Sequence, residues 1–129
     1  MTPATSRKTA RRQALYLLYQ WDLTGQELAS LYEGEPDSFA LLLAEAVSAR
    51  ADALDRRISA ASPDWPADRL GTLERNILRI GVYELEEETV PRAVAINEAV
   101  VLAKRYATEE AGRLVNGVLA RIAREEEAA

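Results

Sequence analysis

Apolar residues recur at helical spacing along most of the chain, and no stretch alternates apolar and polar residues for long enough to predict a strand. Residues that start or stop helices divide this pattern into segments. Thr5 or Ser6 is suited to cap a first helix that runs to about Leu23, and Gly25 is suited to close it. A weaker helical stretch is predicted around residues 27–33.

A long helical segment is predicted to follow. It opens at Pro36 and Asp37, and its apolar residues keep helical spacing to about residue 60. The next segment, at residues 62–66, reads as a loop because it contains two prolines. We expect Trp65 in this loop to pack over the edge of the core.

Start signals predict three more helices towards the C-terminus. Thr72 is suited to cap a helix that runs to about Glu87, and Pro91 is suited to begin one that runs to about Tyr106. Thr108 begins the last helix, where the two following glutamates carry the negative charge that the positive end of a helix dipole favours.

The segment LERNILRIGVYEL, residues 73–85, is apolar on two sides, which is typical of a helix at the centre of a bundle. Gly81 within it would let a neighbouring helix approach closely. Asn97 and Asn116 interrupt later apolar runs, and we expect both amides to be buried and to join adjacent helices or a loop. The chain is therefore predicted to be all-α, a single compact bundle of about six to seven helices, with one domain over residues 1–129.

Composition excludes several kinds of chemistry. The 129 residues are 48% apolar and include neither cysteine nor histidine, so disulfides, thiolate metal sites and imidazole catalysis are excluded. The glycines never cluster into a phosphate loop, and the glutamates at 84 and 86–88 are typical of a solvated helix end rather than a metal site. No apolar run is long enough for a signal peptide or a membrane span, which favours the cytoplasm. We expect a non-enzymatic protein without cofactor or metal.

Positive charge is concentrated at the start of an acidic chain. Residues 1–13 contain Arg7, Lys8, Arg11 and Arg12 and no acid, whereas the chain as a whole has a net charge of −5. Such a separate basic patch suggests a local anion site. A solvated N-terminus is the alternative, and charge alone does not decide between them.

The first helix has two different faces. At 100° per residue, its core stripe consists of Ala10, Ala14, Leu17, Leu18 and Trp21. Roughly opposite lie Lys8, Arg12, Tyr16 and Tyr19, so two tyrosines are aligned with a basic turn. Single-stranded RNA offers phosphates to such cations and unpaired bases to such rings. Packing of the tyrosines against another helix is the alternative.

Three segments together, RRQALYLLYQWDLTG, ERNILRIGVYEL and VPRAVAINEAVVLAKRYATEEAGRLVNGVLARI, resemble the NusB family of bacterial transcription antitermination factors. The resemblance spans most of residues 7–123 and is weakest from 26 to 70. It implies an all-helical bundle in two halves that binds the boxA element of nascent RNA. It also implies a heterodimer with NusE, a small-subunit ribosomal protein, which acts with other Nus factors and RNA polymerase, usually on ribosomal RNA operons.

The resemblance also implies particular site residues. The implied RNA-binding positions lie in the arginine-rich N-terminal motif, at the aromatic residue after it and near the start of the last helix. They are Arg7, Lys8, Arg11, Arg12, Tyr19, Tyr106, Glu110 and Leu114. The positions implied to bind the NusE partner are Glu74, at the head of the second segment, and neighbours such as Arg75. Some relatives carry Phe where this chain has Leu114, and the position of Arg12 is often acidic. Tyr16 is added from the helical face alone.

Two other functions remain open from the sequence. NusB-like domains also occur at the front of RNA cytosine methyltransferases, as accessory domains. A purely protein-binding bundle could instead dock an acidic partner on its basic face. Some family members form homodimers, so a homodimer is possible, whereas no membrane partner is expected. We also expect residues 1–5 to be mobile and residues 125–129 to form an acidic tail.

Overall fold

The computed structural model describes residues 6–32, 34–35 and 37–128, and this part of the chain is helical without any strand. Its α-helices are α1 Arg7–Thr24, α2 Ser38–Ala49, α3 Ala51–Ala61, α4 Thr72–Glu87, α5 Arg92–Tyr106 and α6 Glu109–Ala128. Two 3-10 turns complete it, η1 Leu28–Leu31 and η2 Ala67–Arg69. The all-α prediction is confirmed. The expected mobility of residues 1–5 lies outside the described residues.

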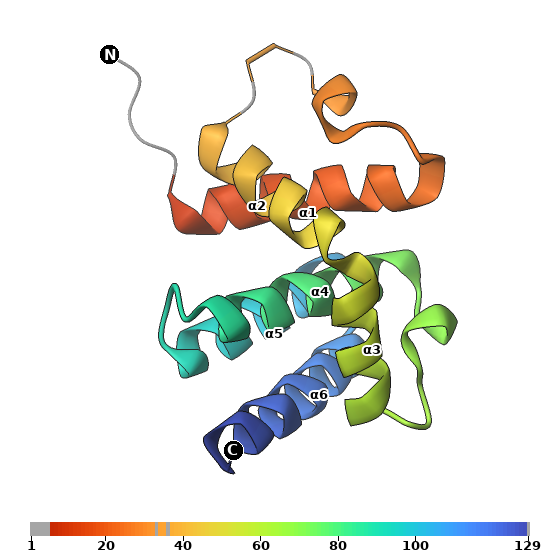
Figure 1. Cartoon of the computed structure of the whole chain (residues 1–129), viewed down its shortest axis with the longest axis vertical. Coiled ribbons are helices and arrows are strands. Elements are labelled where there is room, and N and C mark those ends of the chain that lie inside the picture. The colour runs from red at the N-terminus through yellow and green to blue at the C-terminus, as the bar shows by residue number, and fades with distance from the viewer. Residues whose placement is uncertain (1–5, 33, 36, 129) are drawn as a thin grey trace.

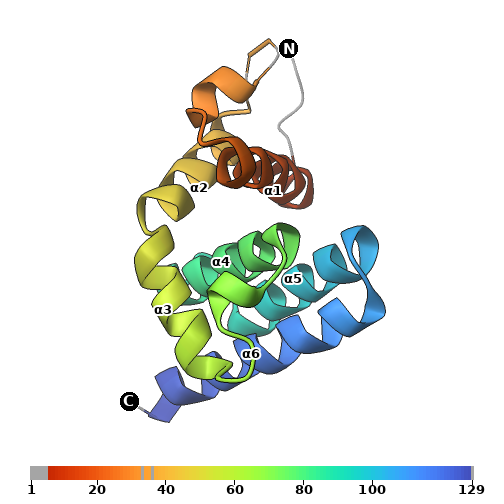
Figure 2. The ribbon, with the colours of Figure 1, turned by 90° about the vertical axis from the view of Figure 1, so that its right-hand side faces the viewer.

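The helices form two groups joined by α3 (Figure 1). Figure 2 shows α1 and α2 at one end of the molecule and α4, α5 and α6 at the other, with α3 along one side between them. Helix α4 contacts each of the other five α-helices, and its residues 76–82 are all buried. A Cβ on Gly81 would lie only 2.6 Å from Leu119 Cδ1 of α6, which confirms the predicted close approach.

Local side-chain chemistry explains most helix ends. Ser6 Oγ accepts a hydrogen bond from the Thr9 amide at 3.2 Å, and Gly25 closes α1 with a φ of 72°. Thr108 Oγ1 caps α6 in the same way, 2.9 Å from the Ala111 amide. Thr72 differs from its prediction: it is the first residue inside α4, and its side chain makes no capping bond.

Two predictions about the segment between α1 and α4 are wrong. The helix expected from Asp37 to about residue 60 is broken at Arg50, whose φ of −112° and ψ of 14° turn the chain. The break lets α2 cover α1 while α3 covers α4 and α6. Trp65 does not plug the core, because 55% of its surface is exposed.

The two amides expected in the core are also misplaced. Asn97 and Asn116 both lie on the surface. The buried amide is Asn76 in α4, which is completely covered. Its Nδ2 donates to the Thr72 carbonyl at 2.8 Å and to Asp22 Oδ2 at 3.1 Å. The apolar neighbours of an Asn in the sequence therefore did not indicate its burial.

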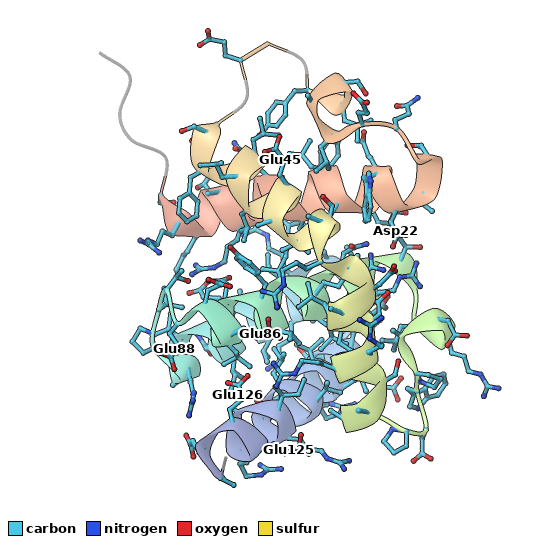
Figure 3. The ribbon with its side chains drawn as sticks, viewed as in Figure 1. Asp22, Glu45, Glu86, Glu88, Glu125 and Glu126 are labelled. Carbon is cyan, nitrogen blue, oxygen red and sulfur yellow. The ribbon has the colours of Figure 1, made fainter. Side chains whose placement is uncertain are left out.

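Asp22 fastens the C-terminal end of α1 to α4 (Figure 3). Its Oδ2 accepts hydrogen bonds from Arg75 Nη2 at 2.9 Å and Arg79 Nη1 at 3.1 Å, besides the Asn76 amide. Arg79 also pairs with Asp55 of α3, at 2.6 Å from Nη2 to Oδ2. We call these five residues the Asp22 cluster. It joins α1, α3 and α4 through ion pairs and hydrogen bonds.

The glutamates at the end of the chain belong to α6 rather than to a separate tail. Glu126 Oε1 lies 3.0 Å from Arg57 Nη1, and the same guanidinium nitrogen lies 2.7 Å from Glu86 Oε1. Figure 3 shows Glu86 and Glu126 on the facing sides of α4 and α6. Arg92 of α5 pairs with Glu127 at 3.2 Å. These pairs tie the end of α6 to α3 and α5, and Arg57 also links it to Glu86 of α4.

The Asp22 cluster generates a prediction about acid stability. Burial alone would raise the pKa of Asp22, but the hydrogen bonds and charges of Arg75, Arg79 and Asn76 outweigh it and lower that pKa. A lowered folded-state pKa stabilises the fold above the ordinary Asp value of about 3.9, and this contribution is lost as the pH falls through the folded pKa. Asp22→Asn should therefore cost about 2 kcal/mol at pH 7 and much less at pH 3.

Urea unfolding at pH 7, 5 and 3 measures this cost. Asp64→Asn is the matched control, because Asp64 is exposed in the loop before η2 and makes no ion pair in the described structure. A cost that stays the same at all three pH values would contradict the assignment.

Candidate nucleic-acid interface

The outward face of α1 lies on the surface, as predicted. Ala10, Ala14, Leu17 and Leu18 are buried. On the opposite side, Tyr16 is 62% exposed and Tyr19 is 38% exposed. The two tyrosines are therefore not buried between helices, which was the alternative explanation for them.

The face of α1 meets the C-terminal end of α5 in a groove with two recesses. The smaller recess, of about 370 Å³, is lined by Arg12, Leu15, Tyr16, Tyr19, Leu73 and Tyr106. The wider one, of about 560 Å³, is lined by Thr9, Arg12, Gln13, Tyr16, Leu17, Gln20, Leu31, Tyr32 and Tyr106. We call the two together the tyrosine groove, because Arg12, Tyr16 and Tyr106 line both. The fold thus unites predicted residues from opposite ends of the chain.

Two guanidinium groups have no carboxylate partner within the described structure: that of Arg12, which lines the tyrosine groove, and that of Arg105, next to Tyr106 in the sequence. Arg12 Nη2 donates to Thr9 Oγ1 at 3.3 Å, and no acidic oxygen lies within ion-pair distance of it. The Arg105 guanidinium lies 5.5 Å from the centre of the Tyr106 ring. Sequence reasoning missed Arg105, although its position next to Tyr106 could have indicated it. The groove therefore combines aromatic surface with uncompensated positive charge.

The other two surface cations of the N-terminal motif point elsewhere. The Arg7 guanidinium lies 5.2 Å from the centre of the Phe39 ring on α2. Lys8 Nζ lies 3.6 Å from Glu98 Oε1 on α5, with 76% of the Lys8 side chain exposed. Both remain accessible to a ligand, but they flank the tyrosine groove rather than line it.

Arg11 does not lie on the predicted surface. It is only 5% exposed, and it pairs with Glu84 of α4 through two hydrogen bonds, Nε to Oε1 at 2.7 Å and Nη2 to Oε2 at 2.9 Å. The hydrogen bond to Glu84 raises the pKa of Arg11, so its charge persists inside the protein. The prediction that Arg11 offers its charge to RNA is wrong, because the guanidinium is paired with Glu84 and holds α1 to α4.

Three of the remaining predicted residues line a separate recess beside η2. This η2–α6 recess, of about 470 Å³, is formed by Trp65, Arg69, Leu70, Gly71, Glu74, Thr108, Glu110, Ala111 and Leu114. It brings Glu74, predicted for a protein partner, together with Glu110 and Leu114, predicted for RNA. Leu73 lines the tyrosine groove and Glu74 lines the η2–α6 recess, so the two hollows adjoin at the first turn of α4.

Arg75 is held by the fold. Besides its bonds to Asp22, its Nη1 donates to the carbonyls of Ala67 at 3.2 Å and Leu70 at 3.1 Å. Only 16% of its side chain is exposed. Arg75 therefore shapes the loop around η2, and Glu74 is the member of the predicted pair that faces the recess.

In the part of the chain that the structure describes, no group of three or more acidic side chains is arranged to hold a metal ion. No helix there is both long and apolar enough to cross a bilayer. What the surface offers is a groove suited to stacking and to binding anions.

Comparisons with known proteins agree on one family. The NusB family model matches residues 8–124. The chain is 43% identical to transcription antitermination protein NusB of Dictyoglomus thermophilum, over 92% of this chain and 84% of that protein. It is 41% identical to the protein of the same name from Rubrobacter xylanophilus, over 88% and 87%.

Solved structures show the same similarity. T. maritima NusB superposes with a TM-score of 0.84 at 32% identity, over 95% of this chain and 94% of that chain. A chain in the crystal structure of antitermination factors NusB and NusE in complex with dsRNA superposes with a TM-score of 0.80 at 34% identity, over 92% and 96%.

The buried Arg11–Glu84 pair generates a stability prediction. Glu84→Gln should lower the free energy of unfolding by about 3 kcal/mol, because it leaves the Arg11 charge buried without a counter-charge. The double variant Arg11→Met/Glu84→Leu should recover most of this loss, since it removes both charges and fills the space with apolar atoms.

Urea unfolding of the single and double variants tests this prediction. Arg121→Ala is the control, because it removes an exposed pair with Glu125 and one long hydrogen bond, of 3.4 Å, to the Ala61 carbonyl, and should cost less than about 1 kcal/mol. A Glu84→Gln variant as stable as this control would show that the pair is not needed to hold α1.

Proposed function

Because the chain belongs to the NusB family, we propose that it is a transcription antitermination factor that binds boxA-type single-stranded RNA together with the NusE ribosomal protein. It acts as a binding protein rather than an enzyme. In this role it joins other Nus factors on RNA polymerase and promotes processive transcription of ribosomal RNA operons in the cytoplasm. The named relatives favour this function over an accessory domain of a methyltransferase.

The observation that carries the proposal is the tyrosine groove. Tyr16, Tyr19 and Tyr106 present exposed rings, and Arg12 provides a charge that no carboxylate of the described structure neutralises. Unpaired bases stack on aromatic rings, and phosphates bind cations, so these groups match both parts of a single strand. A duplex keeps its bases inside the stack and could use only the charge.

The net charge of the chain adds direction to this binding. The protein has a formal charge of −5, so an RNA strand is repelled by much of its surface and is attracted where cations lack partners. Arg12 and Arg105 are such cations beside the groove, and Arg7 and Lys8 lie on the flanking turns of α1. Charge complementarity of this kind steers a ligand to one site.

We assign the NusE partner to the η2–α6 recess. Its lining includes Trp65, which is more than half exposed, and the carboxylate of Glu74, which makes no ion pair in the described structure. An exposed aromatic next to an uncompensated charge is typical of a residue pair that anchors a protein interface. The recess adjoins the tyrosine groove, so the protein partner and the RNA would lie side by side.

The RNA assignment predicts how two substitutions change binding. Tyr16→Leu should weaken binding of a boxA-type RNA about tenfold, because leucine cannot stack on a base. Arg12→Ala should weaken it and should lower the slope of log K against log salt by about 0.7, the value for one phosphate contact on a single strand. Fluorescence anisotropy at several salt concentrations measures both effects.

Arg124→Ala is the matched control for charge. It removes one exposed arginine of α6 that makes no ion pair in the described structure and lines neither hollow. This variant should bind RNA like the unaltered protein. If Arg12→Ala keeps the original salt slope, the tyrosine groove is not the RNA site.

The partner assignment predicts that a substitution in the η2–α6 recess weakens the binding of NusE. Glu74→Ala should weaken binding of purified NusE at least tenfold, as expected when one side of a buried charge pair is removed, and it should leave the fold intact. Glu45→Ala is the control, since Glu45 is exposed on α2 in Figure 3. Isothermal titration calorimetry measures both, and equal affinities for the two variants would contradict the assignment.

A further inference from the structure

The wider recess of the tyrosine groove contains polar groups that binding to the RNA backbone does not require. Beyond Arg12 and the two tyrosines, its lining includes the side chains of Gln13 and Tyr32. Its volume of about 560 Å³ lies within the range of pockets that hold small organic ligands. Arg12 already supplies the cation that a phosphate needs here, so the amide and the hydroxyl are available for a second role.

Tyr32 fixes the orientation of the Gln13 amide. The Tyr32 hydroxyl donates to Gln13 Oε1 at 3.3 Å. A tyrosine hydroxyl ordinarily keeps its proton at neutral pH, and burial raises the pKa of Tyr32 further, so this hydroxyl is a donor. The carbonyl end of the amide is therefore occupied, and its Nε2 has no partner among the described residues. An amide held in this way presents the hydrogens of its Nε2 to a ligand.

The walls of the recess suit a flat ligand. Tyr16 comes from the middle of α1 and Tyr106 from the end of α5; Tyr16 is 62% exposed and Tyr106 is 43% exposed. Arg12 lies on the same wall as Tyr16, one helical turn earlier. A planar group between the tyrosines would therefore lie close both to a positive charge and to the Gln13 amide.

We propose that the wider recess is a base-recognition subsite, in which one unpaired uracil or guanine stacks on Tyr16 or Tyr106 and accepts a hydrogen bond from Gln13 Nε2. Arg12 binds the adjacent phosphate. The proposal rests on the RNA-binding function proposed above and adds selectivity to it. Uracil and guanine offer carbonyl oxygens at their edges, whereas adenine has an amino group at the corresponding place, which would face a donor.

The test uses the full chain and a nine-nucleotide single-stranded boxA-type RNA in which each uridine and each guanosine is replaced in turn by adenosine or by an abasic ribose. At one position, the unaltered protein should prefer the original uridine or guanosine to adenosine about three- to tenfold, the effect of one hydrogen bond. In Gln13→Leu this preference should disappear, while the salt dependence of binding stays unchanged. Tyr32→Phe should reduce the preference, because it frees the amide to turn.

A further variant separates selectivity from other effects. Gln26→Leu, at an exposed glutamine outside the recess, should bind like the unaltered protein. Thermal unfolding of each variant shows whether the fold is retained, and the position-by-position ratios are independent of the amount of active protein.

The outcomes distinguish the subsite from the function. If the protein binds the RNA but Gln13→Leu keeps the same base preference at every position, the subsite proposal is overturned and the RNA-binding function stands. If the unaltered protein binds none of the RNAs, with or without NusE, both are overturned. Loss of preference at one position alone supports the subsite.

Discussion

Arg11 and Glu84 form a buried charged pair between α1 and α4, and the geometry of the whole site depends on it. The pair fixes the second turn of α1, while Asp22 fixes its end about three turns further along. Two fastenings at different heights prevent α1 from rotating about its own axis. The next residue, Arg12, is turned by about 100° from Arg11 and therefore has to face the tyrosine groove.

The groove also depends on how far apart its parts lie in the sequence. Tyr16 and Tyr106 come from helices that pack on different sides of α4, and α4 itself contributes Leu73. Because α4 is buried along most of its length, it cannot shift without disturbing every other helix. The groove is therefore preorganised, and a ligand does not have to supply the energy to form it.

The sequence predicted what local chemistry determines. Caps at Ser6 and Thr108 and the two-sided apolar pattern of α4 depend only on neighbouring residues, and they were found. Arg11 was misassigned because its partner lies 73 residues away. Arg50 breaks one helix into two without interrupting its apolar period. Tyr32 and Gln13 were not predicted as a pair because only the fold brings η1 and α1 together.

Because the two hollows adjoin at Leu73 and Glu74, RNA and NusE would lie next to each other and could strengthen each other's binding. A rigid α4 leaves little room for a change of shape that passes from one hollow to the other. Cooperativity can instead come from direct contact between the two ligands, held next to each other on one surface. Such coupling is reciprocal, so NusE would strengthen RNA binding by the same factor as RNA strengthens NusE binding. The Asp22 cluster holds the first turn of α4 through the hydrogen bond from Asn76 to the Thr72 carbonyl. That turn fixes the distance between the two hollows, on which this coupling depends.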